Sequence, residues 1–349
     1  MKNKEYWIKR DEQRIMNEDE NIKNLEKYLE TQYNKASKDI EKEIRYLISK
    51  YQKEGEFTYI ETLKLLTGSE YKEFKYDLET YIKLIEETAD QELLKELNTL
   101  SKRVRLTRLE RMLFDISKTV NNLSFTIKDK MTEFLENSIK ETYNKTVYNT
   151  QQFLGLGFTF AKVSKDYIIK TLNKPWAGSN YSNRIWKHRD RLKSNLKNTI
   201  TDMLIRGVGV NKASKELKDK TKDLFIKTNN NIKSHFKAIQ RLIRTEHAYY
   251  VEQSTKKAYN ELDVEKYEIL ATLDTKTSAI CRALDGKVFK IDEAIVGINY
   301  PPFHQNCRTT TIPYFDDVDD TRVARDKKGK TIRISSKMKY NEWYKKFAK

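Results

Sequence analysis

The sequence has few of the residues that break helices. Its 349 residues include only 4 prolines and 10 glycines, while charged residues make up 34% and hydrophobic residues 38%. Because lysine and glutamate are tolerated well in helices, we expect long helices over most of the chain. The length exceeds that of a usual single domain and predicts two or three domains. The low apolar content suits extended helical bundles better than one compact globule.

Cysteine and long apolar runs are also scarce. Two cysteines in a chain of this length exclude a disulfide framework. No segment approaches the roughly 20 apolar residues that a membrane span needs. The first residues, MKNKEYWIKRDEQRIMNEDE, have no apolar core of the signal-peptide type. We therefore expect no membrane span, and a protein that is kept in the cytoplasm where it is made or packed into a particle assembled there.

Positive charge is what the chain has in excess. The formal net charge is +17, which points to polyanions or an acidic protein partner. Residues 321–349 hold 11 Lys and Arg against 2 Asp and Glu, so this tail carries 11 − 2 = +9. We expect the tail to be mobile or weakly helical when free. Its candidate DNA-binding residues are Arg322, Arg325, Lys327, Lys328, Lys330, Arg333, Lys337 and Lys339.

The N-terminal third has the periodicity of long helices. Apolar residues recur at spacings of three, four and four, a period of about 3.67 residues, which predicts one long helix that ends near Gly55. In TGSE, residues 67–70, Gly68 is expected to stop one helix and Ser69 to cap the next. The sequence thus predicts an elongated helical N-terminal region over residues 1–125. The periodic positions are Ile22, Leu25, Leu29, Tyr33, Ala36, Ile40, Ile44, Leu47 and Tyr51.

The pattern changes toward the C-terminus. Amphipathic helices are expected from Ile185 to Ile200 and over residues 231–262. Short β-branched segments follow, KYEILATLDT, GKVFKI and RTTTIPYF, separated by turn signals such as Asp285-Gly286. The predicted fold is therefore mainly α with a small C-terminal α+β module. The expected domains are 1–125, then 126–315 with its strands after residue 262, and then an acidic linker and basic tail over 316–349.

Five stretches in a fixed order resemble one family. They are KPWAGSNYSNRIW, LIRGVGVNKASKEL, RLIRTEHAYY, TLDTKTSAICRALDGKVF and PPFHQNCRTTTIPYF, and they are similar to the phage head morphogenesis family, the minor head proteins like protein F of phage Mu. The resemblance covers about residues 130–315. It implies a virion component of few copies, bound near the portal inside the head, with portal and other head proteins as partners. Non-specific contact with packaged DNA would suit the positive charge.

The stretch from Pro301 to Phe315 contains a histidine and a cysteine in H-x-x-C spacing. In the family the positions of Ser278 and Thr309 usually hold cysteine, whereas this chain keeps Cys281, His304 and Cys307. These three residues are the candidate metal ligands.

Three interpretations of these residues stay open. A zinc site would need a fourth ligand such as Asp274, Asp285 or water. A disulfide between the two cysteines would form only outside a reducing cytosol. In the third interpretation, which we favour, both cysteines are small buried residues and the histidine is a hydrogen-bonded core residue. We therefore expect no cofactor, with zinc as the alternative.

Arg244 and Glu246 lie two positions apart in a predicted helix and cannot face each other. Buried charges need partners, and Asp274 and Arg308 are natural candidates. We interpret these four residues as a structural polar cluster and not as a catalytic set.

Two classes of function compete. The leading hypothesis is a non-enzymatic structural protein of the phage head, present in the virion and in the host cytoplasm during assembly. The alternative is an enzyme carried in the virion, either a metal-dependent nuclease around His304 and the cysteines or a toxin-like transferase of a kind sometimes fused to this family's domain. The nuclease is disfavoured because the 4 histidines form no H-x-H or H-E-x-x-H motif.

Overall fold

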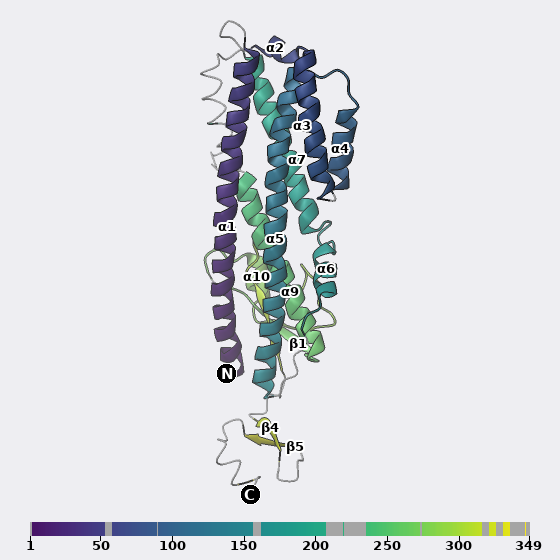
Figure 1. The fold of residues 1–349 in the computed structure, drawn as a ribbon. Helices are drawn as coiled ribbons and strands as arrows, with labels where there is room; N and C mark the ends of the chain where they lie inside the picture. The colour runs from purple at the N-terminus through teal and green to yellow at the C-terminus, as the bar shows by residue number, and fades with distance from the viewer. Residues whose placement is uncertain are drawn as a thin grey trace. The chain divides into compact units, whose positions relative to one another are not determined.

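The computed structural model describes residues 2–52, 58–88, 90–155, 162–206, 219, 235–272, 274–315, 321–325, 331–335 and 346. The chain is mainly helical (Figure 1). Its helices are α1 (Lys2–Tyr51), α2 (Tyr59–Leu63), α3 (Gly68–Glu86), α4 (Gln91–Ser101), α5 (Arg108–Leu154), α6 (Lys165–Asn173), α7 (Tyr181–Ile205), α9 (His235–Glu261) and α10 (Ala279–Leu284). Its strands are β1 (Lys266–Leu270), β2 (Val288–Lys290), β3 (Thr310–Tyr314), β4 (Thr321–Arg325) and β5 (Thr331–Ser335). The predicted fold class is confirmed.

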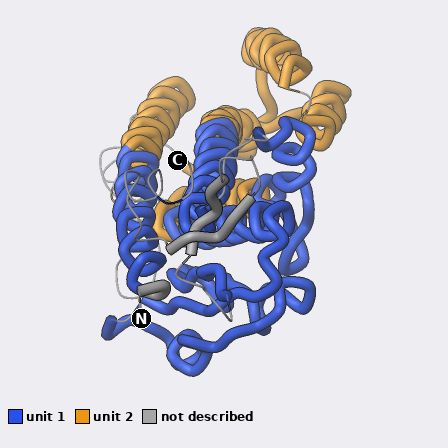
Figure 2. Tube along the Cα trace, turned by 90° about the horizontal axis from the view of Figure 1, so that it is seen from below, with its two compact units in different colours: residues 1–27, 128–184, 239–349 blue, residues 28–127, 185–238 orange. Residues whose placement is uncertain are grey.

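The chain divides into two compact units (Figure 2). The first contains residues 1–27, 128–184 and 239–349, and the second contains residues 28–127 and 185–238. Each unit is assembled from segments that are distant in sequence, because α1, α5, α7 and α9 contribute residues to both. The division into three consecutive domains stays a prediction.

Helix α1 shows how closely apolar spacing determines the helical part. It has 50 residues, which corresponds to about 75 Å at about 1.5 Å per residue. All nine periodic residues of the predicted stripe are buried. The helix ends at Tyr51, close to the predicted end near Gly55.

The start of α3 corrects the prediction for residues 67–70. Gly68 is the first helical residue, and Thr67 is the N-cap in place of Ser69. The reason is a capping box, in which the Glu70 carboxylate accepts a hydrogen bond from the Thr67 backbone N–H at 2.7 Å and the Thr67 hydroxyl accepts from the Glu70 N–H. This cap fixes the entry of a helix whose Phe74 and Leu78 lie in the core of the second unit.

In the first unit, a three-stranded antiparallel sheet has the order β2-β1-β3, and Tyr267 and Ile269 of β1 share a hydrophobic cluster with Tyr259 of α9. Tyr267 of β1 pairs with Phe289 on one side and Pro313 on the other. The Tyr259 hydroxyl of α9 donates to the Thr311 carbonyl at 3.1 Å and so ties the helix to β3. Gly286, at φ +74°, makes the turn before β2 that the Asp285-Gly286 pair predicts.

The basic tail contains strands where we expected a mobile or weakly helical segment. β4 and β5 form a two-stranded antiparallel sheet in which Val323 pairs with Arg333. Residues TRVAR and TIRIS are rich in β-branched side chains, which favours extended structure. The expectation is therefore wrong for residues 321–325 and 331–335.

Within the described ranges, no helix has both the length and the apolar character that crossing a membrane requires.

Candidate functional site

The three candidate metal ligands come together in the first unit. Cys281 lies on α10, while His304 and Cys307 lie in the loop between β2 and β3. Both cysteines are free and buried, and their Sγ atoms are 3.8 Å apart. His304 Nε2 lies 3.2 Å from the Cys281 sulfur, and the three ligand atoms all lie within 4.8 Å of one another. Two residues 26 positions apart in sequence thus converge with a histidine at one point.

Two hydroxyls border this cluster. Ser278 is the N-cap of α10, where its Oγ accepts from the Cys281 N–H at 3.2 Å, and the same oxygen lies 2.9 Å from His304 Nε2. The Thr309 hydroxyl also hydrogen-bonds to the Cys281 side chain. Ser278 and Thr309 are the two positions where the family resemblance led us to expect cysteine, and both reach the cluster with an oxygen in place of a sulfur.

The histidine ring is oriented by its own loop. His304 Nδ1 lies 2.8 Å from the Gln305 carbonyl oxygen, which can only accept a hydrogen bond. The neutral ring therefore carries its proton on Nδ1, and Nε2 presents a lone pair toward Cys281 and Ser278. This is the tautomer in which a histidine binds a metal through Nε2.

The two thiols differ in acidity. Burial raises the pKa of the Cys307 thiol above its ordinary value. Burial acts in the same direction on Cys281, but hydrogen bonds at its side chain, above all those of Ser278 and Thr309, outweigh it and hold the pKa of Cys281 below its ordinary value. Cys281 is therefore the first of the pair to become a thiolate.

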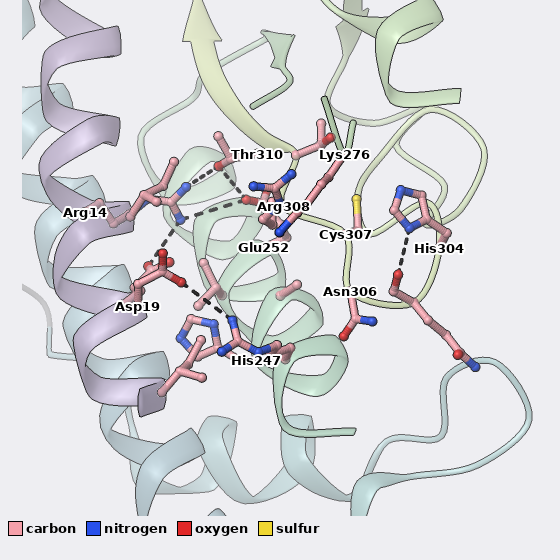
Figure 3. Close-up of a pocket in the computed structure, with 18 residues that line it drawn as sticks. Arg14, Asp19, His247, Glu252, Lys276, His304, Asn306, Cys307, Arg308 and Thr310 are labelled. Carbon is pink, nitrogen blue, oxygen red and sulfur yellow. Dashed lines mark hydrogen bonds and ion pairs between the residues drawn. The ribbon is translucent and has the colours of Figure 1, made fainter. Parts of the chain in front are cut away.

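A pocket of about 510 Å³ borders the cluster (Figure 3). Arg14 and Asp19 line it from α1, His247 and Glu252 line it from α9, and the loop from His304 to Thr310 closes another side. Its walls are thus rich in charge of both signs.

Arg14 and Glu252 form the buried ion network of this pocket. The Glu252 carboxylate accepts hydrogen bonds from the Thr310 hydroxyl at 2.7 Å and the Thr311 hydroxyl at 2.9 Å. The Arg14 guanidinium lies 2.6 Å from Asp11 and 4.0 Å from Glu252. Burial raises the pKa of Glu252 to about 7 against the opposing effect of Arg14. The network joins α1, α9 and β3.

The predicted polar cluster does not form as one unit. Asp274 and Arg308 do pair, through two bonds of 2.6 and 2.7 Å at the surface. Arg244, which is only half-buried, instead pairs with Glu26 of α1 at 2.9 Å. Glu246 is fully buried.

Two other residues bind the Glu246 carboxylate. The Trp176 indole N–H donates to its carboxylate at 2.8 Å, and Arg184 of α7 forms an ion pair with it. Residues two apart on a helix point about 200° away from each other, so Arg244 and Glu246 meet different neighbours. The expected partners were wrong for these two residues because both actual sets come from distant helices and loops.

The two aspartates considered as a fourth metal ligand have other roles. Asp274 is held by Arg308, and Asp285 accepts the Ala271 backbone N–H at 2.8 Å. Among the described residues, neither belongs to the group of ligand atoms within 4.8 Å.

Arg14 and Glu252 were missed by sequence reasoning. Glu252 lies in a stretch of α9 that is buried nearly all round, including Tyr250, Val251 and Ser254. Such a helix has no clearly polar face. The spacing of its apolar residues therefore does not reveal whether an acidic residue is buried or exposed. The one available signal was an isolated glutamate among apolar and small residues.

The candidate DNA-binding residues fall in two groups. Arg322, Arg325 and Arg333 lie on β4 and β5. The other five, Lys327, Lys328, Lys330, Lys337 and Lys339, lie outside the described residues.

Comparison with known families decides the assignment of the C-terminal part. Residues 194–312 match the model of the family described as Phage Mu protein F like protein. This region is therefore similar to the phage Mu protein F-like family. It contains the whole candidate metal cluster and α9, and it lies inside the 130–315 range of the sequence resemblance.

Two curated relatives extend beyond that region. The chain is 24% identical to the Minor head protein GP7 of Bacillus phage SPP1 over 353 residues, covering 95% of this chain and 98% of that protein. It is 25% identical over 289 residues to the NAD(+)--arginine ADP-ribosyltransferase EFV of Enterococcus faecalis. That match covers 78% of this chain, which spans only 55% of the enterococcal protein. No solved structure matches the chain.

Proposed function

We propose that the chain is a minor structural protein of a tailed-phage head, bound beside the portal inside the head. It would act in head morphogenesis and in genome packaging or ejection. The observation that carries this proposal is the match to a minor head protein over 95% of this chain and 98% of the relative. The F-like region at residues 194–312 supports the same structural role.

The portal is the partner that this proposal requires. Co-expression of the tagged chain with the portal protein from the same genome tests it, with the major capsid protein as a competitor in the same cells. We expect the portal to co-purify with the chain at a fixed ratio while the capsid protein stays in the flow-through. Equal recovery of both proteins, or recovery of neither, would contradict portal association.

DNA is the second proposed contact. The net charge of +17, with +9 of it in residues 321–349, favours binding to phosphate without sequence preference. Three of the candidate arginines, Arg322, Arg325 and Arg333, belong to β4 and β5. Host cytoplasm is then the place of assembly and the head interior the place of function.

An enzyme carried in the virion is the alternative, and the similarity to an enterococcal protein named as an ADP-ribosyltransferase is the observation that favours it. The test is incubation of the chain with labelled NAD⁺ and an arginine-containing acceptor protein, and separately with supercoiled DNA and divalent cations. We expect neither transfer of label nor cleavage beyond a heat-denatured control. Turnover in either assay would support the enzymatic alternative.

A further inference from the structure

The distance between the two cysteine sulfurs matches the geometry of a metal site. Zinc–thiolate bonds are about 2.3 Å long, so two thiolates on one tetrahedral zinc lie about 3.8 Å apart. The Cys281 and Cys307 sulfurs are 3.8 Å apart in the fold. A disulfide would need them to approach to about 2.05 Å. The pair therefore has the spacing of two ligands of a single ion without further movement.

The histidine adds a nitrogen to the two sulfurs, which together are the ligand atoms that zinc prefers. His304 Nε2, which presents its lone pair, lies 3.2 Å from the Cys281 sulfur. Nitrogen and sulfur ligands on one tetrahedral zinc are about 3.6 Å apart, from bonds of about 2.05 and about 2.3 Å. The ring is held in this orientation by the bond from Nδ1 to the Gln305 carbonyl, the kind of support that histidine ligands of metals receive.

We propose that Cys281, His304 and Cys307 bind one Zn²⁺ ion, with a water molecule at the fourth position. Two thiolates and an imidazole select zinc over calcium or magnesium, which require oxygen ligands. Asp274 and Asp285 do not supply the fourth ligand because each is held by another group. The sequence led us to expect no cofactor, with zinc as the alternative, and the proposal takes up that alternative.

The ion would connect two parts of the fold that are distant in sequence. Cys281 belongs to α10, a helix of 6 residues, and His304 and Cys307 belong to the loop that precedes β3. Binding energy at such a site adds directly to folding energy. Zinc would therefore stabilise α10 and this loop against each other within the F-like region.

Cobalt substitution tests the proposal on the full chain. The reduced protein is freed of metal with a chelator and titrated with Co²⁺, which reports its ligands by absorption. We expect one Co²⁺ per chain, with the strong visible bands of tetrahedral geometry and a near-ultraviolet thiolate charge-transfer band, both removed by one equivalent of Zn²⁺. X-ray absorption of the zinc form should show two sulfurs at about 2.3 Å. A reduced, folded protein that binds no Co²⁺ would overturn the proposal.

Variants locate the ion. Cys307→Ser and His304→Gln should weaken zinc binding more than about 100-fold, beyond the loss typical of a supporting residue. His247→Gln, a histidine in the wall of the neighbouring pocket, is the matched control and should bind normally. Unchanged binding in Cys307→Ser would show that the ion is elsewhere.

A gain-of-ligand variant keeps the test valid if those variants fail to fold. The Ser278 oxygen already lies 2.9 Å from His304 Nε2. Ser278→Cys should therefore place a third thiolate on the ion, strengthen the charge-transfer band and tighten zinc binding. If Ser278→Cys leaves both the band and the affinity unchanged, the cluster is not the metal site.

Discussion

Glu252 is a buried carboxyl group whose protonation should make the stability of the fold depend on pH. Burial raises the pKa of its carboxyl from 4.5 to about 7, so the folded state favours the protonated form. The stability that this preference contributes is complete below about pH 4.5 and is lost as the pH rises through about 7. Wild-type protein should therefore lose stability between about pH 5 and about pH 8 relative to Glu252→Gln, which cannot ionise. Melting temperatures of the two proteins across this range measure the difference, and parallel curves would contradict the assignment.

Glu246 predicts a large stability effect from a single residue. It is fully buried, and its partner Arg184 is only 19% exposed. Removing one partner of a buried ion pair costs about 3–5 kcal/mol because the other charge is left uncompensated. Glu246→Ala should therefore unfold at markedly lower denaturant concentration, whereas Asp274→Ala, at the surface pair with Arg308, should change little. Equal effects of the two substitutions would show that the Glu246 pair does not stabilise the fold.

The partners of these residues mark the limit of prediction from sequence. The requirement that Glu246 find a partner followed from burial of a charge, but Arg184 lies 62 positions away and was not identifiable. The candidate metal ligands were identifiable because Cys and His are rare in this chain. Their convergence, and the hydroxyls of Ser278 and Thr309 beside them, depend on how α10 and the loop before β3 pack.

At the scale of elements, the start of α3 depends on one side chain. The Thr67 hydroxyl accepts the Glu70 backbone N–H, and Glu70 returns a hydrogen bond to Thr67. Thr67→Ala should destabilise the protein by about 1 kcal/mol, the usual cost of losing such a cap. Thr67→Ser keeps the hydroxyl and is the control. Chemical denaturation of the three proteins gives the values, and an alanine variant as stable as the serine variant would argue against the capping box.

If the chain binds DNA as proposed, the arginines of β4 and β5 predict how binding depends on salt. Each phosphate neutralised contributes about −0.9 to the slope of log K against log salt. Replacing the three arginines of the strands with glutamine should therefore flatten this slope by up to about 2.7 units without unfolding the protein. A matched triple variant at exposed positions elsewhere should keep the wild-type slope. The two sets are Arg322, Arg325 and Arg333, and Arg45, Lys140 and Lys145.

If the strand variant and the control variant lose the same amount of affinity for DNA, then overall charge, and not the strands, determines binding. An unchanged slope in the strand variant would remove the tail from the DNA contact and favour a protein surface as its partner. Duplexes of different sequence but equal length separate non-specific from specific binding in the same titrations.

Elements differ in how far local sequence determines them. The stripe of α1 and the turn at Gly286 were predictable, because helical periodicity and positive φ are local properties. The N-cap of α3 was misplaced by two residues, since Thr67 and Ser69 are both good caps and only the Glu70 contact decides between them. The β4–β5 pair was missed because the high charge of the tail outweighed its alternating Thr, Val and Ile.

At the scale of the whole molecule, the similarity to a minor head protein covers 95% of the chain and therefore extends into both compact units. The F-like match at residues 194–312 likewise includes parts of each. The proposed structural role thus concerns the whole chain rather than the candidate metal cluster alone. If the proposed zinc binds, its removal should lower stability without changing the proposed role in the head.

The protein content of purified virions tests this role most directly. On the proposed function the sequence comes from a phage genome, and that phage is grown in two forms, one intact and one with a stop codon at Trp7. The stop mutant is complemented in a control culture. Quantitative mass spectrometry of DNA-filled heads should find this chain at few copies beside the portal, and find it missing only in the uncomplemented mutant. Virions that contain portal peptides but none of this chain, while the lysate contains it in abundance, would contradict the account.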